Sequence, residues 1–252
     1  MANGESSLAK QPVLIAIGGL DPGGGAGLVR DWLTATERGA RATLIGSAWT
    51  DQGPAGVAAV EPRQESAFAA ALEGALRSAG RRAAVKVGMI ATPALAGVVA
   101  AAMEPSPLPL VYDPVLAASA GGALYEGSLA GLEPLLRRAD LVTPNAPEAA
   151  ALAGVTVEQP SDARRAATIL RERGARAVLI KGGHLRGDAV DLLLTAQGES
   201  LFRAPRVPGP GLRGTGCALA TAIAVELARG VDLAAAVGAA KEWLLGKLRA
   251  AG

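Results

Sequence analysis

The residues best suited to do chemistry surround the single cysteine of the chain, Cys217. Gly214, Thr215 and Gly216 come directly before it, and a strongly helical stretch, 218–226, follows. A glycine-rich turn that opens a helix directs several free backbone N–H groups at one point, and the helix dipole adds positive potential there. Such a site would stabilise an anion, or the charge that develops during phosphoryl transfer. The same field lowers the pKa of a first-turn thiol, so Cys217 is a candidate thiolate base or hydrogen-bond acceptor.

Two simpler interpretations compete with this one. A lone cysteine is usually a small buried hydrophobic residue, although packing alone does not explain its place behind a Gly-Thr-Gly turn. A second glycine-rich stretch, GGLDPGGGAG at 18–27, lacks the Gly-Lys-Ser/Thr of a Walker A loop. It also fails the GxGxxG pattern, because Leu28 stands where the third glycine belongs. Taken alone, this stretch is typical of a turn before a helix.

The remaining polar candidates stand at the ends of apolar, strand-like runs. They follow or close the runs 12–19, 42–50, 83–90, 108–115, 140–145 and 177–183, and they are Asp21, Gln52, Met89, Asp113, Asn145, Glu148 and Lys181. In open α/β sheets, ligands bind outside the carboxyl ends of the strands. We therefore expect these side chains to meet at one rim of a sheet.

The elements that must position them alternate between strands and helices. Helical patterns cover 27–39, 64–79, 93–103, 132–139, 164–177, 216–229 and 233–249. Strands that are continuously apolar, with helices between them, predict a mostly parallel sheet covered on both faces. Residues 188–207 predict a hairpin that adds an antiparallel edge. We expect one domain over 12–250 after a disordered tail, 1–11.

Composition excludes several classes of function. The net charge is +2, and the Arg-rich stretch 164–177 has no interleaved aromatic residues, which argues against nucleic-acid binding. One cysteine makes neither an internal disulfide nor, by itself, a zinc site. There is no apolar signal core and no run of 18 apolar residues, so we expect a soluble cytoplasmic protein with no membrane segment.

The order and spacing of several motifs resemble the hydroxymethylpyrimidine/phosphomethylpyrimidine kinase family of thiamine biosynthesis, within the ribokinase-like superfamily. The resemblance runs over nearly the whole chain. It rests on GGLDPGGGAGLVRD (18–31), TDQGPAGV (50–57), KVGMI (86–90), DPV (113–115), TPNAPEA (143–149), KGGH (181–184), GTGC (214–217) and AAKEWLLGKL (239–248). It implies a ribokinase-like three-layer α/β/α fold. It also implies ATP- and Mg²⁺-dependent phosphorylation of 4-amino-5-hydroxymethyl-2-methylpyrimidine and then of its monophosphate.

The resemblance also implies roles for individual residues. Cys217 would stand where most ribokinase-like enzymes have an aspartate base, and 214–216 would form the backbone cradle for the transferring phosphoryl group. The substrate pocket would be formed by Gly19, Asp31, Gln52, Met89 and Val115. The nucleotide would be held by Lys181, Lys241 and Asn145, and the metal shell would include Asp113 and Glu148. Two carboxylates beside a triphosphate suit Mg²⁺, which takes hard oxygen ligands and often binds through water.

Simpler roles stay open for some of these residues. Asp31 is also consistent with a surface helix position, Lys181 with an extended strand-end lysine, and Glu148 with a carboxylate at a helix N-terminus. Lys241 lies on an otherwise ordinary late helix. Two departures concern the site: Arg213 replaces the histidine that often precedes GTGC, and Gly53-Pro54 follows Gln52 where relatives carry Asn-Thr.

Three other functions remain as alternatives. A pyridoxal or pyridoxine kinase is the nearest, because this cysteine branch includes such activities. A catalytically silent pyrimidine-binding regulator is the second. A sugar kinase is disfavoured, because the superfamily's sugar enzymes usually carry aspartate at the position of Cys217. The partners expected are a small pyrimidine and ATP. The sequence does not determine the oligomeric state, and a homodimer is left open.

Overall fold

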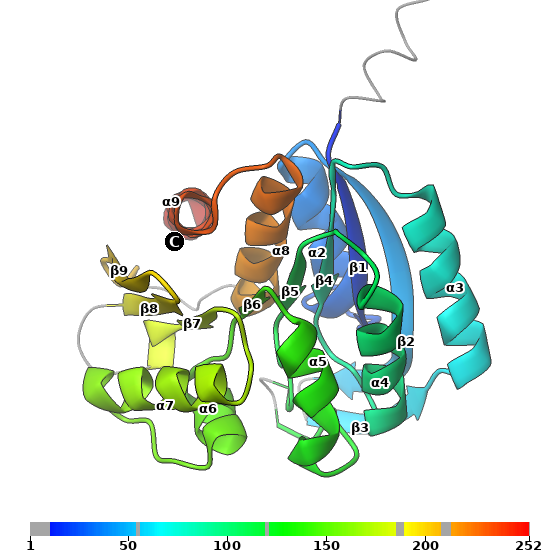
Figure 1. Cartoon of the computed structure of the whole chain (residues 1–252), viewed down its shortest axis with the longest axis horizontal. Helices are drawn as coiled ribbons and strands as arrows, with labels where there is room; N and C mark the ends of the chain where they lie inside the picture. The colour runs from blue at the N-terminus through cyan, green and yellow to red at the C-terminus, as the bar shows by residue number, and fades with distance from the viewer. Residues whose placement is uncertain (1–10, 54–55, 119–120, 185–188, 208–212, 252) are drawn as a thin grey trace, which may run out of the picture.

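The structure is a computed structural model, and it describes residues 11–53, 56–118, 121–184, 189–207 and 213–251. These residues form one mixed sheet with the strand order β3-β2-β1-β4-β5-β6-β7-β8-β9 (Figure 1). The strands from β2 to β7 in this order run parallel, while β3 at one edge and β8 and β9 at the other pair antiparallel. The strands are β1 (Val13–Leu20), β2 (Arg41–Gly53), β3 (Gly56–Pro62), β4 (Ala83–Val87), β5 (Leu110–Tyr112), β6 (Leu141–Val142), β7 (Val178–Ile180), β8 (Ala189–Thr195) and β9 (Gly198–Ala204).

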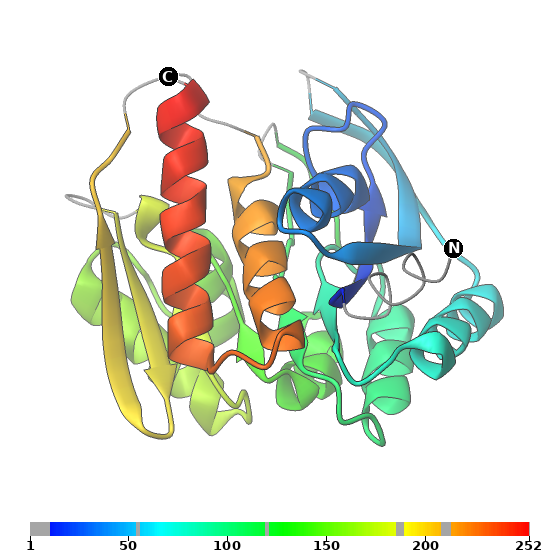
Figure 2. The ribbon, with the colours of Figure 1, turned by 90° about the horizontal axis from the view of Figure 1, so that it is seen from above.

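Helices cover both faces of this sheet and make a three-layer α/β/α fold (Figure 1 and Figure 2). One face carries α2, α8 and α9, and the other carries α3 to α7. Two short 3₁₀ turns, η1 and η2, complete the described structure. The helical bounds are α2 (Gly27–Glu37), α3 (Glu65–Ser78), α4 (Pro93–Met103), η1 (Leu129–Leu132), α5 (Glu133–Arg138), α6 (Ala146–Ala153), α7 (Pro160–Glu172), η2 (Gly182–His184), α8 (Thr215–Ala228) and α9 (Leu233–Ala251).

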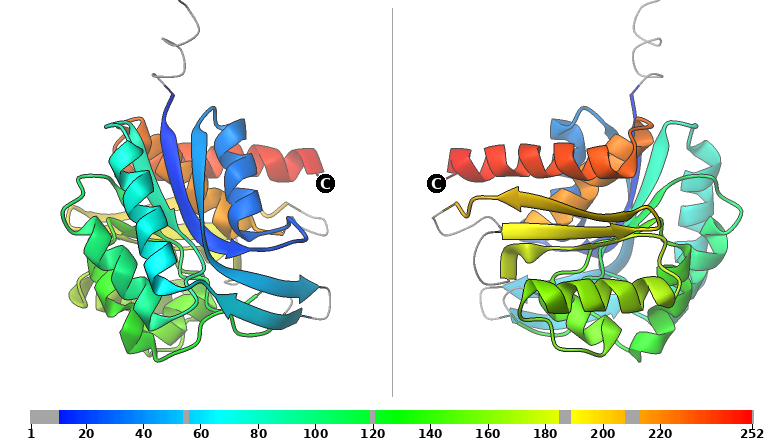
Figure 3. Two further views of the ribbon diagram at one scale, coloured as in Figure 1. Left: turned by 90° about the vertical axis from the view of Figure 1, so that its right-hand side faces the viewer. Right: turned by 60° about the vertical axis from the view of Figure 1, so that its left-hand side comes forward.

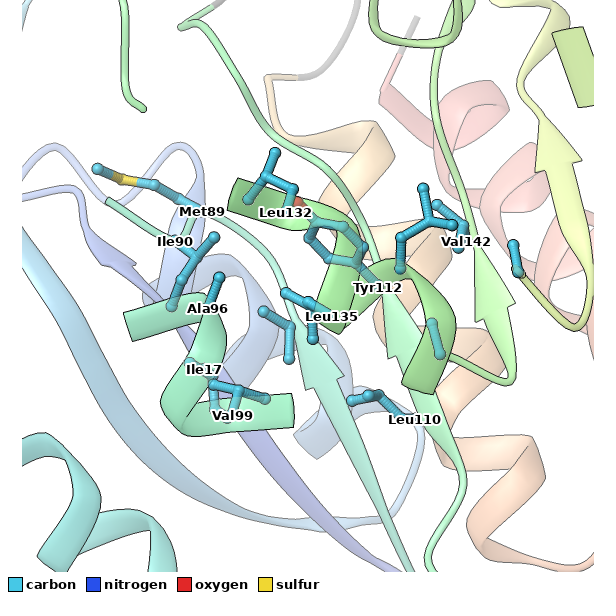
Figure 4. Packing of buried hydrophobic residues seen from close by; sticks show 14 of the residues in the cluster. Ile17, Met89, Ile90, Ala96, Val99, Leu110, Tyr112, Leu132, Leu135 and Val142 are labelled. Carbon is cyan, nitrogen blue, oxygen red and sulfur yellow. The ribbon is translucent and has the colours of Figure 1, made fainter. Parts of the chain in front are cut away.

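The two cores follow from the alternation of side chains along the strands. In β1, Leu14 and Ala16 point into the core under α2, α8 and α9, whereas Ile15 and Ile17 point into the core under α3 to α7. All four side chains are buried. Figure 4 shows the second core, where Tyr112 packs among aliphatic side chains from both the sheet and the helices. The parallel strands β1, β5, β6 and β7 are buried along almost their whole length, and they are made of apolar residues and glycine.

The predicted fold class is confirmed, and the hairpin predicted at 188–207 is β8 and β9. Two elements were not predicted. The antiparallel strand β3 buries none of its residues, so it lacks the apolar alternation of a half-buried strand. The helix α6 has eight residues, too few to show a clear period. Residues 1–10 of the predicted tail lie outside the described residues, and a single domain over 12–250 stays a prediction.

Candidate active site

A cavity of about 400 Å³ lies at the carboxyl ends of the parallel strands. It is lined from the ends of β1, β2, β4, β5, β6 and β7 and from the start of α8. The structure thus brings together twelve of the fourteen site residues predicted from the sequence, while their chemical roles stay predictions. These twelve are Gly19, Gln52, Met89, Asp113, Val115, Asn145, Glu148, Lys181, Gly214, Thr215, Gly216 and Cys217.

Two close backbone contacts hold the loops of the cavity together. A Cβ on Gly27 would lie 2.3 Å from the carbonyl oxygen of Gly19, and a Cβ on Gly214 would lie 2.5 Å from that of Gly25. Gly27 and Gly214 also have positive φ angles, +58° and +74°, which disfavour any other residue. The β1–α2 loop and the start of α8 therefore meet without intervening side chains.

The start of α8 has the geometry of an anion cradle. Its N-cap residue is Gly214, so no side chain caps the first-turn N–H groups, and no acidic residue lies in that turn. These N–H groups and the helix dipole favour negative charge at the cavity. A cation lies beside them, because a Cβ on Gly216 would be 3.1 Å from Lys181 Nζ. The backbone geometry expected of the cradle is thus present, with a lysine on one side, and its role in phosphoryl transfer stays a prediction.

Two roles are predicted for Cys217, thiolate base and hydrogen-bond acceptor, and its surroundings favour the second. Cys217 is only 8 % exposed, and burial raises the pKa of its thiol to about 11. Lys86 and the backbone N–H of Gly27 lower this pKa, but they do not compensate for burial, and the charges of Asp113 and Asp31 raise it further. The raised pKa favours the neutral thiol near neutral pH, and a thiol that lines the cavity can give or accept a hydrogen bond.

Lys181, Asp113 and Glu148 form a charged cluster on the side of the cavity that β5 to β7 supply. Lys181 Nζ donates to Asp113 Oδ1 over 2.6 Å and lies 3.9 Å from Glu148 Oε2. Burial raises the pKa of Asp113, but Lys181 and Lys86 outweigh it and the net pKa is lowered. Burial raises the pKa of Glu148 to about 7 against the opposing charge of Lys181, and Asp113 adds to the rise. The cluster therefore changes its charge near neutral pH.

Glu148 and Asn145 form a capping box at the start of α6. The backbone N–H of Asn145 donates to Glu148 Oε2 over 2.8 Å, and that of Glu148 donates to Asn145 Oδ1 over 2.9 Å. The helix N-terminal role that the sequence left open for Glu148 is thus present in the structure. It leaves the second carboxylate oxygen of Glu148 for a ligand, since no donor from the described residues reaches it.

The donors of this cluster fit a magnesium ion held largely by water and phosphate. In the described residues no group of three or more carboxylate, histidine or cysteine side chains could enclose a metal. Asp113 and Glu148 instead flank a lysine, and Asp113 Oδ2 faces the cradle, 4.0 Å from a Cβ on Gly216. Mg²⁺ commonly takes one or two carboxylates together with substrate phosphates and water. Asp113 and Glu148 would supply these carboxylates.

Asp31 does not line the cavity, and its assignment to the substrate pocket stays a prediction. Its side chain is fully buried, and both of its carboxylate oxygens accept hydrogen bonds from Lys86 Nζ over 2.9 Å. One of them also accepts from Thr221 Oγ1 over 2.8 Å. The surface position that the sequence left open is excluded. Asp31 joins α2, β4 and α8 from beneath the cavity.

Lys241 does not line the cavity either, and its assignment to the nucleotide stays a prediction. Its Nζ donates to the carbonyl oxygens of Ala189 and Phe202 over 3.1 and 2.6 Å, and it lies 2.8 Å from Asp191 Oδ2. Asp191 Oδ1 in turn accepts from the backbone N–H of Gly182 over 2.8 Å. Lys241 thus fastens α9 to the β8–β9 hairpin, which lies beneath that helix (Figure 3).

The opposite side of the cavity is less charged and suits a ring. Met89 packs against Gly19, where a Cβ would lie 2.4 Å from its Sδ. Gln52 Nε2 donates to Thr50 Oγ1 over 3.1 Å, which leaves its carbonyl oxygen for a ligand. Val115 lines the same cavity together with Leu124. Apolar surface with one oriented amide is the composition expected of a small-ligand site.

Lys86 is the main site residue that sequence reasoning missed. It lines the cavity, yet its residue is fully buried in the middle of the apolar strand β4. A lysine in a continuously apolar strand is unusual enough to signal a buried partner, because an unpaired buried charge is costly. Asp31 is that partner, and nothing in the local sequence connects the two residues.

The fold is shared with solved kinases. A phosphomethylpyrimidine kinase from Clostridium difficile superposes with a TM-score of 0.79 at 29% identity, over 95% of this chain and 100% of its own. A pyridoxal kinase from Staphylococcus aureus superposes with a TM-score of 0.85 at 28% identity, over 95% of this chain and 88% of its own. Fold and cavity therefore define a ribokinase-like α/β kinase.

Sequence comparison narrows this class. The phosphomethylpyrimidine kinase family matches residues 21–251. A hydroxymethylpyrimidine/phosphomethylpyrimidine kinase from Streptomyces coelicolor is 39% identical over 243 residues, which are 95% of this chain and 89% of that protein. The thiamine biosynthesis bifunctional protein ThiED of Geobacter sulfurreducens is 36% identical over 94% of this chain and 49% of its own length. The chain belongs to the phosphomethylpyrimidine kinase family.

Proposed function

We propose that the protein transfers the γ-phosphoryl group of ATP to hydroxymethylpyrimidine and then to the resulting monophosphate, yielding the diphosphate. The observation that supports this most directly is the order of groups along the cavity. A weakly charged ring site with Gln52 lies on one side, the uncapped start of α8 in the middle, and the cluster of Lys181, Asp113 and Glu148 on the other. A phosphoryl group would pass from the charged side to the ring side across the cradle.

In the first step the hydroxymethyl oxygen attacks the γ-phosphorus. The bond from that phosphorus to the oxygen of the β-phosphate breaks, ADP leaves, and the hydroxyl proton passes to solvent. Cys217 would accept a hydrogen bond from the hydroxyl and orient it. Because the transition state of phosphoryl transfer is loose, the proton needs to leave only late, and a strong base is not required. This accounts for a neutral thiol at a position where related kinases carry aspartate.

In the second step the nucleophile is a phosphate oxygen of the monophosphate. It is already ionised near neutral pH, so no base is needed, and the new bond forms the pyrimidine diphosphate with release of ADP. Backbone N–H groups of 214–217 and Lys181 would stabilise the charge on the transferring group. Mg²⁺ held by Asp113 and Glu148 would neutralise the phosphates and keep them aligned.

A substrate comparison tests the proposed function. Initial rates are measured with hydroxymethylpyrimidine, its monophosphate and pyridoxal, each with ATP and Mg²⁺. We expect both pyrimidines to give kcat/KM values at least about 10-fold above that of pyridoxal. A preference for pyridoxal would favour the pyridoxal kinase alternative, which the similarity to the Staphylococcus aureus pyridoxal kinase supports. Binding of pyrimidine without turnover would favour a silent regulator.

Alanine substitutions at two glycines test the role of the cradle. In Gly214→Ala the new Cβ would collide with the carbonyl oxygen of Gly25, which displaces the start of α8. Gly230→Ala is the matched control, because Gly230 has a similar φ of +83° but open space around its Cβ position. We expect Gly214→Ala to lose phosphoryl transfer and Gly230→Ala to keep it. Equal activity of the two variants would contradict the role of the cradle.

Two further points stay predictions. No helix among the described residues is long and apolar enough to cross a membrane. We predict a cytoplasmic location, and a homodimer is left open.

A further inference from the structure

Three cations from the described residues line the cavity, and they differ in how tightly they are held. Lys86 is buried and bound to both oxygens of Asp31. Lys181 is largely buried and bound to Asp113. Arg213 is different: its side chain is 49 % exposed, and its nearest carboxylate oxygen, Asp21 Oδ2, is 3.8 Å away. None of the described residues accepts a hydrogen bond from its guanidinium, so its donors are available to a ligand.

The Asp21 carboxylate is not a strong competitor for this guanidinium. Its two oxygens already accept hydrogen bonds from the backbone N–H groups of Gly23 and Ala26, over 2.9 and 3.1 Å. Asp21 therefore serves mainly to shape the β1–α2 loop. The guanidinium of Arg213 lies against that loop, with three of its atoms 3.4 Å from the Cβ position of Gly25. This contact fixes the side of the cavity on which the charge stands.

Arg213 and Lys181 stand on opposite sides of the cradle. Lys181 comes from the end of β7 and meets Gly216, together with Asp113 and Glu148. Arg213 contacts the β1–α2 loop at Gly25, and this loop follows β1, the strand that ends at Gly19 and Leu20 on the ring side. In the sheet, β1 and β7 are separated by β4, β5 and β6. The cradle thus has one cation toward the donor phosphates and another toward the acceptor.

We propose that Arg213 binds the phosphate of the phosphorylated pyrimidine and thereby determines acceptance of that substrate for the second phosphorylation. The inference rests on the proposed function. When the acceptor is an alcohol, only the donor brings negative charge to the cradle. When the acceptor is itself a phosphate, two anions must approach each other, and the acceptor needs its own counter-charge. A guanidinium fork pairs with phosphate through two parallel hydrogen bonds, which makes Arg213 suited to the task.

The test compares wild type with Arg213→Met and Arg213→Lys on the alcohol and on the monophosphate. For Arg213→Met we expect the KM of the monophosphate to rise by about 10- to 100-fold, the range for loss of a charged hydrogen bond. The KM of the alcohol should change less than about 2-fold, because it carries no charge. The KM of Arg213→Lys for the monophosphate should lie between that of wild type and that of Arg213→Met. Lysine keeps the positive charge but lacks the paired N–H donors of the guanidinium. Dissociation constants measured without nucleotide should follow the same order.

Arg82→Met is the control, because Arg82 is exposed and lies at the start of β4, at the opposite end of the strand from the cavity. It should leave both KM values unchanged. Equal increases in KM for alcohol and monophosphate in Arg213→Met would overturn the proposal, as would an increase confined to the KM of ATP, which would place Arg213 at the donor. A wild-type protein that neither binds nor phosphorylates the two pyrimidines would overturn the proposed function itself.

Discussion

Lys86 Nζ lies 2.9 Å from each carboxylate oxygen of Asp31, and both side chains are almost fully buried. This pair joins a strand of the sheet to α2. Through Thr221, which lies one turn after Cys217, it also reaches α8. The cavity therefore lies above a buried charged pair. Lys86 lines the cavity, whereas Asp31 does not.

Breaking this pair should destabilise the protein strongly. Asp31→Asn leaves a buried lysine without its counter-charge, and Lys86→Met leaves a buried carboxylate. We expect each to lower the free energy of unfolding by about 3–5 kcal/mol. Removing both charges should cost less than the sum, because no unpaired charge remains. Thr221→Val, which loses one hydrogen bond, should cost about 1 kcal/mol. Urea unfolding of the four variants measures this. Additive losses would show that the two charges act independently.

Cys217 should alkylate more slowly than an ordinary thiol. With a pKa of about 11 instead of 9.0, the thiolate fraction near neutral pH is lower by about 100-fold. The iodoacetamide rate should rise with pH throughout the neutral range. Cys217→Ala should keep the fold and reduce kcat for the alcohol by less than the ~10²–10⁴-fold typical of a lost general base. Fast alkylation at neutral pH would restore the thiolate hypothesis.

Glu148 should make stability depend on pH. Its pKa is about 7 in the folded protein and 4.5 in an unperturbed chain. Because the folded pKa is raised, stability is highest below the unfolded value and falls as the pH rises from about 4.5 to about 7, by at most about 3 kcal/mol. Glu148→Gln should remove this decrease, as measured by unfolding in metal-free buffer. A slope that persists in the variant would assign it to another group.

The same variant also tests the metal assignment. Glu148→Gln keeps an acceptor for the N–H of Asn145 and removes charge beside Lys181. We expect a higher Mg²⁺ requirement and a higher KM for ATP, with unchanged pyrimidine binding, because the ring site lies on the other side of the cavity. Activity equal to wild type at limiting Mg²⁺ would exclude Glu148 from the metal shell.

Lys241→Met separates the two roles considered for that lysine. It removes the counter-charge of Asp191 and the donor to two strand carbonyls. We expect a loss of stability of about 3–5 kcal/mol. Any change in the KM for ATP should be indirect, through movement of Gly182, which donates to Asp191. A protein of unchanged stability with a much higher KM for ATP would instead favour direct contact with the nucleotide. Asp191→Asn, which touches the same network, serves as the comparison.

Gln52→Ala should raise the KM for the pyrimidine much more than that for ATP. The Gln52 amide is oriented by Thr50 and lines the ring side of the cavity. Loss of one such contact corresponds to about 1–3 kcal/mol of binding. Steady-state kinetics with each substrate varied in turn measures the difference. Equal KM values for the pyrimidine in variant and wild type would remove Gln52 from the site.

The order of strands and helices, and the gathering of polar residues at one rim, could be predicted from local pattern. Strand ends are local features, and the rule for open α/β sheets converts them into a site. The features that local pattern did not indicate are long-range contacts. The partners of Asp31 and Lys241 lie on other elements, so nothing in the neighbouring sequence indicated that both side chains were already occupied. The pKa of Cys217 depends on how deeply α8 is buried, which the Gly-Thr-Gly motif does not reveal.

The backbone contact between Gly214 and Gly25 has a consequence for folding. The anion cradle needs segments from near the two ends of the chain, so it cannot form before the slowest, most non-local contacts have closed. A partly folded chain without α8 in place would have no affinity for phosphate. Nucleotide should therefore bind only the completed fold and stabilise it by mass action, by an amount that grows with the logarithm of its concentration over its dissociation constant. The phosphoryl donor would thus shift the population from partly folded chains toward the fully folded protein.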